Sequence, residues 1–281
     1  MLLRCGVKSL VKDTKQCFVF EEQQMAKQCS EKGCVAEMEG KRPLNRDVIK
    51  YIAIGTMFLN HVALVFLEQG TLLYEILVDI GYFTAVTMIY FMVEGYDYTR
   101  SRKAYAKRLL LFAILSQIPY CLAFTEDGVI EFVAFNMLFT LLICFGIIHI
   151  MKTRGQDRYA RFWNILLTFA TFCCDWGLIA PIITILFVNA GKDRKKLKKA
   201  WFLAALLFGG LNFASVMESL GVIQAILYGS GCMIPMLLSG VCILYLYNGE
   251  RMKSGWNFLK WFFYLFYPTH LLILGVLRLT L

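Results

Sequence analysis

The sequence predicts an all-α membrane protein, a bundle of about nine transmembrane helices. Hydrophobic residues make up 58% of its 281 residues, charged residues only 17%, and the mean hydropathy is +0.59. Soluble domains run at about 45–50% apolar and about 25% charged residues. From Asp47 onward, apolar runs alternate with short polar breaks, and the basic residues gather in every second break. These observations exclude a disordered chain, a coiled coil and a secreted disulfide scaffold.

Residues 1–43 form a polar extension ahead of the membrane domain, residues 44–281. The extension holds no positive stretch followed by a short apolar run, so no cleavable signal peptide is predicted. Its cysteines show no paired CxxC spacing and have no histidine nearby, which argues against zinc: Cys5, Cys17, Cys29 and Cys34. We expect a weakly ordered or surface-amphipathic cytoplasmic segment with reduced thiols.

Nine apolar segments follow in the membrane domain. Their expected bounds are 47–67, 76–95, 104–124, 133–151, 160–174, 176–190, 199–217, 223–247 and 256–279. The fifth and sixth are short, because a 30 Å hydrocarbon core needs about 20 helical residues. We expect these two to line a cavity or to lie where the bilayer is thin.

The positions of the charges predict the topology. Every lysine and arginine except Arg278 lies before or within the first span, or in the break after span two, four, six or eight and the first residues of the span that follows it. The charged residues of the other breaks are all acidic. By the positive-inside rule the N-terminus is cytoplasmic, and nine spans place the C-terminus outside. The net charge of +9 then faces anionic lipid headgroups, so no nucleic-acid partner is implied.

Polar residues at membrane depth are costly and are therefore functional candidates. His61, near the outer end of the first span, is either a general base or an interfacial histidine bonded to a neighbouring helix. His270 follows Pro268 and is either a second candidate or is satisfied by a backbone carbonyl that the proline frees. His149, at the inner end of span four, is expected to be an interfacial anchor.

Two further candidates belong to the outer half. Asp175 lies in the turn between spans five and six, where its carboxylate can orient a histidine and stabilise the imidazolium. The alternative is an ordinary Asp-Trp-Gly turn. Asn136 opens span four on the same side. Whether the side chains of His61, Asn136, Asp175 and His270 meet is left open by the sequence.

On the inner side, Glu94 ends the second span beside a dense basic cluster: Arg100, Arg102, Lys103 and Arg108. Either Glu94 forms a structural ion pair with Arg100 or Arg108, or the basic groups hold the phosphates of an acyl donor. The run at 193–199 is expected to be a topology signal. No P-loop, GxGxxG, HExxH, CxxC pair or GxSxG occurs in a usable context, so neither a metal, a redox cofactor nor ATP hydrolysis is predicted.

Five ordered blocks resemble the TraX family, whose type member N-acetylates pilin. They are LNRDVIKYIAIGTMFLNHVAL (44–64), YFMVEGYDYTRSRKAYAKRLLLFAILSQIPY (90–120), FNMLFTLL (135–142), DWGLIAP (175–181) and FYLFYPTHLLIL (263–274). The resemblance covers residues 44–281. It implies an integral membrane acyltransferase, similar in plan to the acyltransferase-3 group, which takes acyl groups from cytoplasmic acyl-CoA and modifies acceptors on the outer face.

That wider group has a basic residue, usually arginine, eleven positions before its first-span histidine. Lys50 stands eleven before His61, so the spacing agrees but the bidentate geometry of arginine is lost. We do not extend the pilin acceptor of the type member to this protein, because no segment of this sequence indicates a pilin-specific element.

The resulting expectation is a two-sided enzyme in the plasma or inner membrane. Acetyl-CoA or another acyl-CoA docks through the basic cluster with Lys50 and Glu94, and His61 deprotonates an amine or hydroxyl of a peptide or glycan. Asp175 orients or charge-balances His61, Asn136 donates to the oxyanion, and His270 is a second acid–base group or a pocket wall. The alternatives are a transporter or flippase, which predicts internal repeats that the sequence does not show, and a membrane scaffold.

Overall fold

The computed structural model describes residues 42–125, 131–155, 157–252 and 256–280, with the side chains of 256–260 left out. The chain divides into two units, residues 1–44 and 45–281. Of the first unit only residues 42–44 are described, so the predicted extension and its four cysteines lie outside the described residues. Everything below concerns the second unit.

Each predicted apolar segment corresponds to a helix. The helices are α2 (Arg46–Phe66), α3 (Leu72–Tyr98), α4 (Arg102–Phe124), α5 (Met137–Arg154), α6 (Arg158–Ala170), α7 (Ile179–Ala190), α8 (Arg194–Leu220), α9 (Val222–Val241) and α10 (Trp256–Thr280), with a short 3₁₀ turn η1 (Thr171–Cys173) and a π-helical turn η2 (Cys242–Leu246). In the described ranges the β-structure is limited to isolated bridge residues, such as the bridge between Phe135 and Cys174. The all-α prediction is confirmed.

Short polar side chains set the helix starts. Asn45 accepts hydrogen bonds from the backbone N–H groups of the first turn of α2, and Asp193 does the same for α8. Thr71, Ser101, Asn136 and Asp157 cap α3, α4, α5 and α6 in the same way. The sequence bounds began α3 and α8 too late, because hydropathy marks only the apolar part of a helix and these caps precede it.

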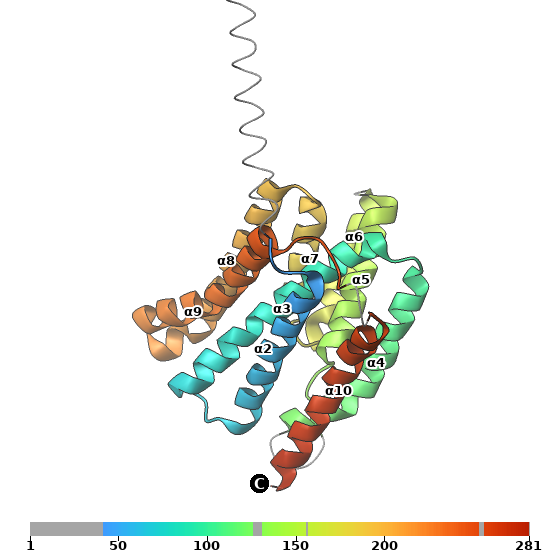
Figure 1. The fold of residues 1–281 in the computed structure, drawn as a ribbon. Coiled ribbons are helices and arrows are strands. Elements are labelled where there is room, and N and C mark those ends of the chain that lie inside the picture. The colour runs from blue at the N-terminus through green and yellow to red at the C-terminus, as the bar shows by residue number, and fades with distance from the viewer. Residues whose placement is uncertain (1–41, 126–130, 156, 253–255, 281) are drawn as a thin grey trace, which may run out of the picture. The chain divides into compact units, whose positions relative to one another are not determined.

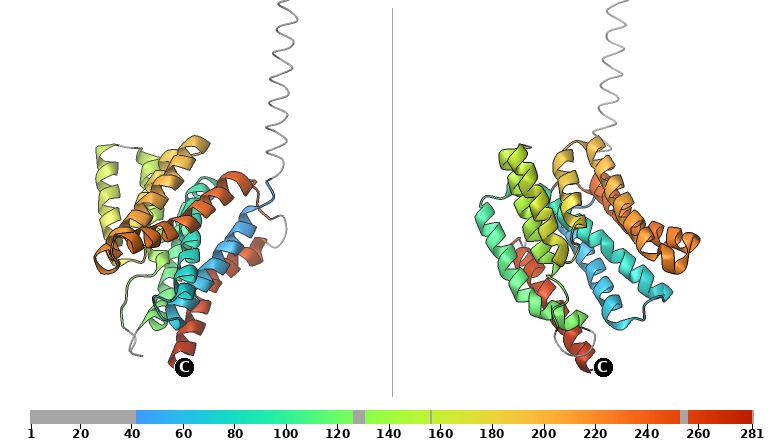
Figure 2. Two further views of the ribbon diagram at one scale, coloured as in Figure 1. Left: turned by 90° about the vertical axis from the view of Figure 1, so that its left-hand side faces the viewer. Right: turned by 180° about the vertical axis from the view of Figure 1, so that it is seen from behind.

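Seven helices of the described chain are long and apolar enough to cross a membrane, as expected of a multi-pass membrane protein. The other two, α6 and α7, have 13 and 12 residues, or about 20 and 18 Å at 1.5 Å per residue. They were predicted to be short, but the count of nine spans is not confirmed. Together α6 and α7 form a hairpin that starts and finishes at the same end of the bundle (Figure 2).

Helix α3 lies at the centre of the bundle and contacts α2, α5, α7 and α9. Helix α10 returns from far along the chain to pack on α4 and α2 (Figure 1). Helices α8 and α9 form a close pair, in which a Cβ on Gly229 would stand 2.6 Å from the carbonyl oxygen of Gly209, so their backbones touch. Because α10 packs on α2, the first and last helices of the bundle are neighbours.

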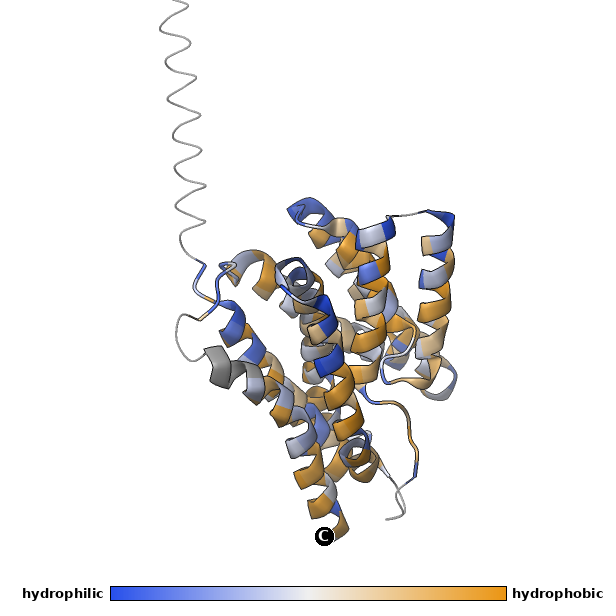
Figure 3. Ribbon diagram, turned by 90° about the vertical axis from the view of Figure 1, so that its right-hand side faces the viewer, coloured by the Kyte–Doolittle hydropathy of each residue, from blue (hydrophilic) through white to orange (hydrophobic). Residues whose placement is uncertain are grey.

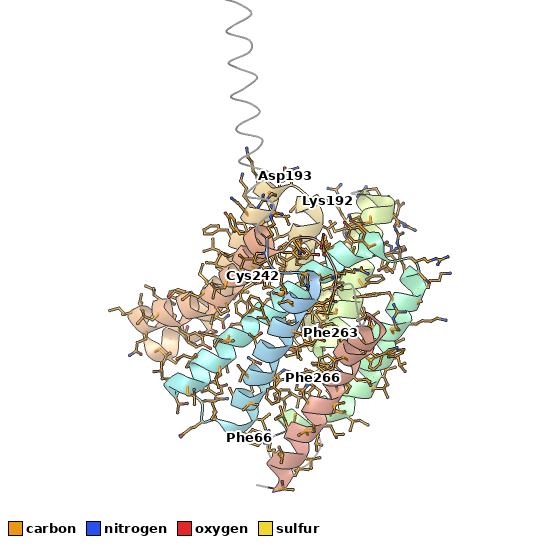
Figure 4. All side chains as sticks on the ribbon, in the orientation of Figure 1. Phe66, Lys192, Asp193, Cys242, Phe263 and Phe266 are labelled. Atoms are coloured by element: carbon orange, nitrogen blue, oxygen red, sulfur yellow. The ribbon has the colours of Figure 1, made fainter. Side chains whose placement is uncertain are left out.

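Charge distinguishes the two ends of the bundle. The basic end holds the starts of α2, α4, α6, α8 and α10, and Lys192 and Asp193 mark it in Figure 4. The opposite, acidic end holds the α2–α3 connection near Phe66 and the C-terminal end of α10. Figure 3 shows hydrophilic residues at the upper helix ends and apolar ones along most of the helices below.

Candidate active site

Two histidines that are 209 positions apart in the chain meet at the acidic half of the bundle. His61 Nδ1 on α2 lies 2.7 Å from His270 Nε2 on α10. The two imidazole rings are nearly parallel, 3° apart, with centroids separated by 5.0 Å. Both side chains are buried. The packing of α10 against α2 brings them together, and the phenyl rings of Phe58 and Phe266 flank His270.

The hydrogen-bond pattern assigns the tautomers of a neutral pair. His270 Nδ1 lies 2.7 Å from the Phe266 carbonyl oxygen, which can only accept, so His270 Nδ1 carries the hydrogen. His270 Nε2 is then an acceptor, and His61 Nδ1 must donate to it. This leaves His61 Nε2 without a hydrogen, which is the form that a general base needs.

His61 faces a cavity of about 380 Å³. Residues of α2, α3, α4 and α10 line this cavity together with the start of α5 and the α6–α7 turn; its polar lining consists of Asn60, His61, Tyr82, Thr84, Tyr120, Asp175 and Tyr267. A volume of this size suits a small ligand group. His270 does not line the cavity; it stands behind His61 and fixes its ring.

Asp175 lines the same cavity from the turn between α6 and α7. This turn is a strained one, since Trp176 and Leu178 have φ of 58° and 63°, which is costly for residues other than glycine. Thr140 Oγ1 donates to the Asp175 carbonyl at 2.5 Å, and the Asp175 N–H donates to the Phe135 carbonyl at 2.8 Å. These bonds to the start of α5 hold the turn in place.

Burial raises the pKa of the Asp175 carboxyl to about 6, and a hydrogen bond from the Trp176 backbone offsets part of that effect. Within the described residues, no hydrogen bond joins Asp175 to either histidine. Of the two roles expected for Asp175, orienting His61 is therefore wrong, because His270 occupies the nitrogen that such a bond would use. Balancing the charge of His61 stays a prediction. Asp175 remains near enough to line the cavity with His61.

Asn136 opens α5, as predicted, but its side chain does not have the predicted role. Its side-chain N–H groups donate to the Ala113 carbonyl at 2.8 Å and to Gln117 Oε1 at 2.9 Å, and its Oδ1 accepts from the Leu138 N–H at 3.0 Å. The side chain is fully buried and does not line the cavity. The expectation of an oxyanion donor at Asn136 is thus wrong; this residue caps α5 and ties it to α4.

A second polar cluster lies at the basic end. The guanidinium of Arg46 donates to the Phe91 carbonyl at 2.9 Å and stands 4.0 Å from Glu94, which also accepts a hydrogen bond from the Tyr247 hydroxyl at 3.1 Å. Asp47 is buried and accepts from the Met252 N–H at 2.7 Å. Glu94 pairs with Arg46, so the predicted partners Arg100 and Arg108 are incorrect.

The other inner-side candidates lie around this cluster. Lys50 Nζ stands 5.0 Å from the centroid of the Phe263 ring on α10. Arg102 is exposed and stacks on Tyr96 at 4.4 Å, and Arg100 and Lys103 are exposed beside it. Arg108 has a buried Nε without a hydrogen-bond partner in the described chain. His149, the predicted anchor, is exposed and its Nδ1 lies 2.7 Å from the buried Tyr96 hydroxyl.

Sequence reasoning overlooked Arg46, Asp47 and Tyr247 at the basic end, and Tyr267 at the cavity. Tyr267 precedes His270 by three positions, so a helical face could have linked the two. Arg46 and Asp47 both lie one turn before Lys50. The sequence indicated Arg46 only as part of the topology signal and Asp47 only as the point where the apolar runs begin. In the described residues no group of three or more histidine, cysteine or acidic side chains is placed to hold a metal ion.

Comparison with known proteins agrees with the sequence blocks. The family model for the TraX protein matches residues 45–278. The probable fimbrial assembly protein FimC, serogroup H1, of Dichelobacter nodosus is 33% identical over 235 residues, which cover 80% of this chain and 92% of that protein. No solved structure matches the chain. The resemblance inferred from the sequence is confirmed, and the chain belongs to the TraX family.

Proposed function

We propose that this protein is a membrane acyltransferase that moves an acetyl or other short acyl group from acyl-CoA to an amine or hydroxyl. The observation that carries the proposal is the His61–His270 pair, which presents a histidine with an unprotonated Nε2 at the wall of a cavity. In this proposal the basic end faces the cytoplasm across the plasma or inner membrane, and the acceptor enters from the acidic end.

The residues at the basic end fit an acyl donor that carries phosphates. Arg102 and Lys103 are exposed on the first turn of α4, and Arg108 has an unpartnered buried Nε one and a half turns further on. Tyr105 lies between the charges, in electrostatic contact with Arg46 and Arg108. Arginine and lysine donors at helix ends suit phosphate groups.

The reach of the donor also agrees with the helix geometry. Lys50 and His61 are eleven residues apart on α2, which corresponds to about 16 Å along the helix axis. An extended pantetheine arm held at its phosphate end near Lys50 can bring its thioester to the level of His61. The proposal thus assigns binding to the basic end and chemistry to the cavity.

In the transfer step, the acceptor nitrogen or oxygen attacks the thioester carbonyl carbon while His61 Nε2 takes the acceptor's proton. The carbon–sulfur bond then breaks, and the leaving thiolate takes up this proton from the His61 imidazolium to give the free thiol of CoA. His270 accepts a hydrogen bond from Nδ1 throughout, and that bond is strengthened when His61 becomes positive. The carboxylate of Asp175 balances the same transient charge.

The relative from Dichelobacter nodosus is named as a probable fimbrial assembly protein. A role in assembling a surface fibre is compatible with acyl transfer, because the acceptor in that case is an amine or hydroxyl of a fibre subunit. A glycan acceptor gives the same chemistry at the cavity. The proposal therefore fixes the reaction class and leaves both acceptor types as substrates to be compared.

The test is purified protein in lipid nanodiscs incubated with acetyl-CoA labelled in the acetyl group, scored for CoA release and for labelled acceptor or self-acylated protein. His61→Ala is expected to lower the rate by about 10²–10⁴-fold, the usual effect of losing a general base. The matched control is His149→Ala, which removes a histidine at the basic end and should keep the wild-type rate.

Three outcomes contradict the proposal. Equal rates for wild type and His61→Ala would assign the activity to another group. Movement of a substrate across proteoliposomes without acyl-CoA would favour a transporter. Lack of turnover together with normal cellular function of His61→Ala would favour a scaffold.

A further inference from the structure

One buried hydroxyl at the cavity has no function in the packing of the bundle. Tyr267 on α10 is 6% exposed, and its Oη makes no hydrogen bond of normal geometry with any described residue. Buried polar atoms are nearly always paired, so an unpaired one needs an explanation. Tyr267 also lines the cavity that His61 faces. Its hydroxyl is therefore a hydrogen-bond donor available to whatever the cavity holds.

Groups of both signs surround the Tyr267 hydroxyl, and the Asp175 carboxyl is in electrostatic contact with it. Its ring contacts both histidines, with centroids 6.3 Å from His61 and 5.7 Å from His270. The backbone N–H of Met137, the first residue of α5, approaches the Tyr267 oxygen without reaching normal hydrogen-bond geometry. The N-terminus of a helix carries a partial positive charge. The hydroxyl thus lies between the proposed base and the positive end of α5.

We infer that Tyr267 is a catalytic residue that donates a hydrogen bond to the carbonyl oxygen of the acyl thioester. This inference rests on the proposed acyl transfer. When the acceptor attacks, the carbonyl double-bond electrons move onto that oxygen, and the Tyr267 O–H stabilises the negative charge. The charge returns to form the carbonyl again as the carbon–sulfur bond breaks. The hydroxyl keeps its own proton, and His61 moves the proton of the acceptor.

Three other polar side chains of the cavity fit this role less well. Tyr82 packs against Trp176 and Phe208 at the far wall, with centroids 5.8 and 4.6 Å away. Thr84 uses its hydroxyl on the Ala53 carbonyl at 2.5 Å, and Asn60 donates to the Val78 carbonyl at 2.8 Å. Asn136, which the sequence suggested for the oxyanion, has a different task. It caps α5 and so positions the helix end beside Tyr267.

The test compares wild type with Tyr267→Phe, which removes only the hydroxyl. Loss of one oxyanion donor is expected to lower kcat by about 10²–10³-fold, with KM for acetyl-CoA changed by less than about threefold. A second readout does not depend on turnover. In the infrared spectrum of bound acetyl-CoA with a ¹³C carbonyl and no acceptor, the carbonyl band should lie at lower frequency in wild type than in Tyr267→Phe.

The control is Tyr264→Phe, one turn earlier on α10, whose ring stacks on Phe112 away from the cavity. It should keep the wild-type rate and carbonyl band. If Tyr267→Phe does not fold, difluorotyrosine at position 267 keeps the hydroxyl but makes it a stronger donor, and should shift the band further down. An unchanged rate or an unchanged band in an active protein overturns the inference. An inactive wild type that binds no acetyl-CoA overturns the proposed function instead.

Discussion

The two polar clusters of the bundle share the same helices but use their hydrogen-bonding groups differently. At the basic end, Glu94 pairs with Arg46 and accepts from the Tyr247 hydroxyl, and Arg46 donates to a backbone carbonyl. The Nε atoms of Arg46 and Arg108 have no hydrogen-bond partner among the described residues. At the cavity, His61 and Tyr267 each keep one group without a protein partner. Polar groups that are hydrogen-bonded to their neighbours stabilise a structure, whereas unpaired polar groups can bind a ligand. The comparison predicts a stability effect at the Arg46–Glu94 pair and rate effects at the cavity.

The largest expected effect is at the basic end. Glu94→Gln removes the negative partner of the buried Arg46 guanidinium and should lower the free energy of unfolding by about 3–5 kcal/mol. Thermal unfolding in detergent measures this loss. The control is Asp97→Asn, which breaks an exposed ion pair with Lys152 at 3.1 Å and should cost less than about 1 kcal/mol. Equal losses in the two variants would show that the buried pair is no more important than the surface pair.

Asp175→Asn tests the cavity wall through its pH dependence. The folded-state pKa of about 6 lies above the ordinary value of 3.8, so the folded protein holds this proton more tightly than the unfolded chain. Wild-type stability should therefore fall as the pH rises from about 4 to about 6, and stay lowered above that window.

Asparagine does not titrate, so Asp175→Asn should match wild type near pH 4 and exceed it at pH 8 by up to about 3 kcal/mol. The same variant should transfer acyl groups more slowly, because the His61 imidazolium loses its balancing charge. Unfolding temperatures at pH 4 and pH 8 measure the first effect. A stability difference that does not change with pH would show that the Asp175 carboxyl is not buried in this way.

The smallest effect concerns the positioning of His61. His270→Ala removes the acceptor that fixes the His61 ring and should slow acyl transfer about 10–100-fold, the usual effect of losing a group that orients another. His270→Gln should recover part of the rate, because its amide oxygen can accept from His61 Nδ1. The pH–rate profiles of the two variants give the check. Equal rates for His270→Gln and His270→Ala would count against a hydrogen-bonding role for His270.

Much of the fold follows from local sequence features. The apolar segments and the capping residues Asn45, Thr71, Ser101, Asp157 and Asp193 mark the helices, because both signals depend only on nearby residues. The number of spans could not be obtained in this way. Residues 160–190 read as two short spans, and only the packing against α5 shows a hairpin whose turn closes on Phe135.

The sequence predicted which residues belong to the candidate site better than it predicted what each of them does. His61 and Asp175 were expected to act together, and the fold brings both to one cavity. His270 was expected as a second acid–base group, and it became the partner of His61. Asn136 was a candidate because a polar residue at membrane depth is costly unless it has a function. Capping a helix is such a function, since it pairs the side chain with backbone N–H groups, and it requires no role in catalysis. Sequence position cannot separate these two uses.

By itself, the sequence determined the class of protein, the extent of its helices and the distribution of charge between its two ends. These properties are sums over neighbouring residues, so they are readable without the fold. Only the tertiary structure decided which polar groups meet, since His61 and His270 are 209 positions apart. It also decided which groups remain unpaired. A hydrogen bond depends on a few tenths of an ångström and on direction, and these are set by how α10 packs on α2 and α4.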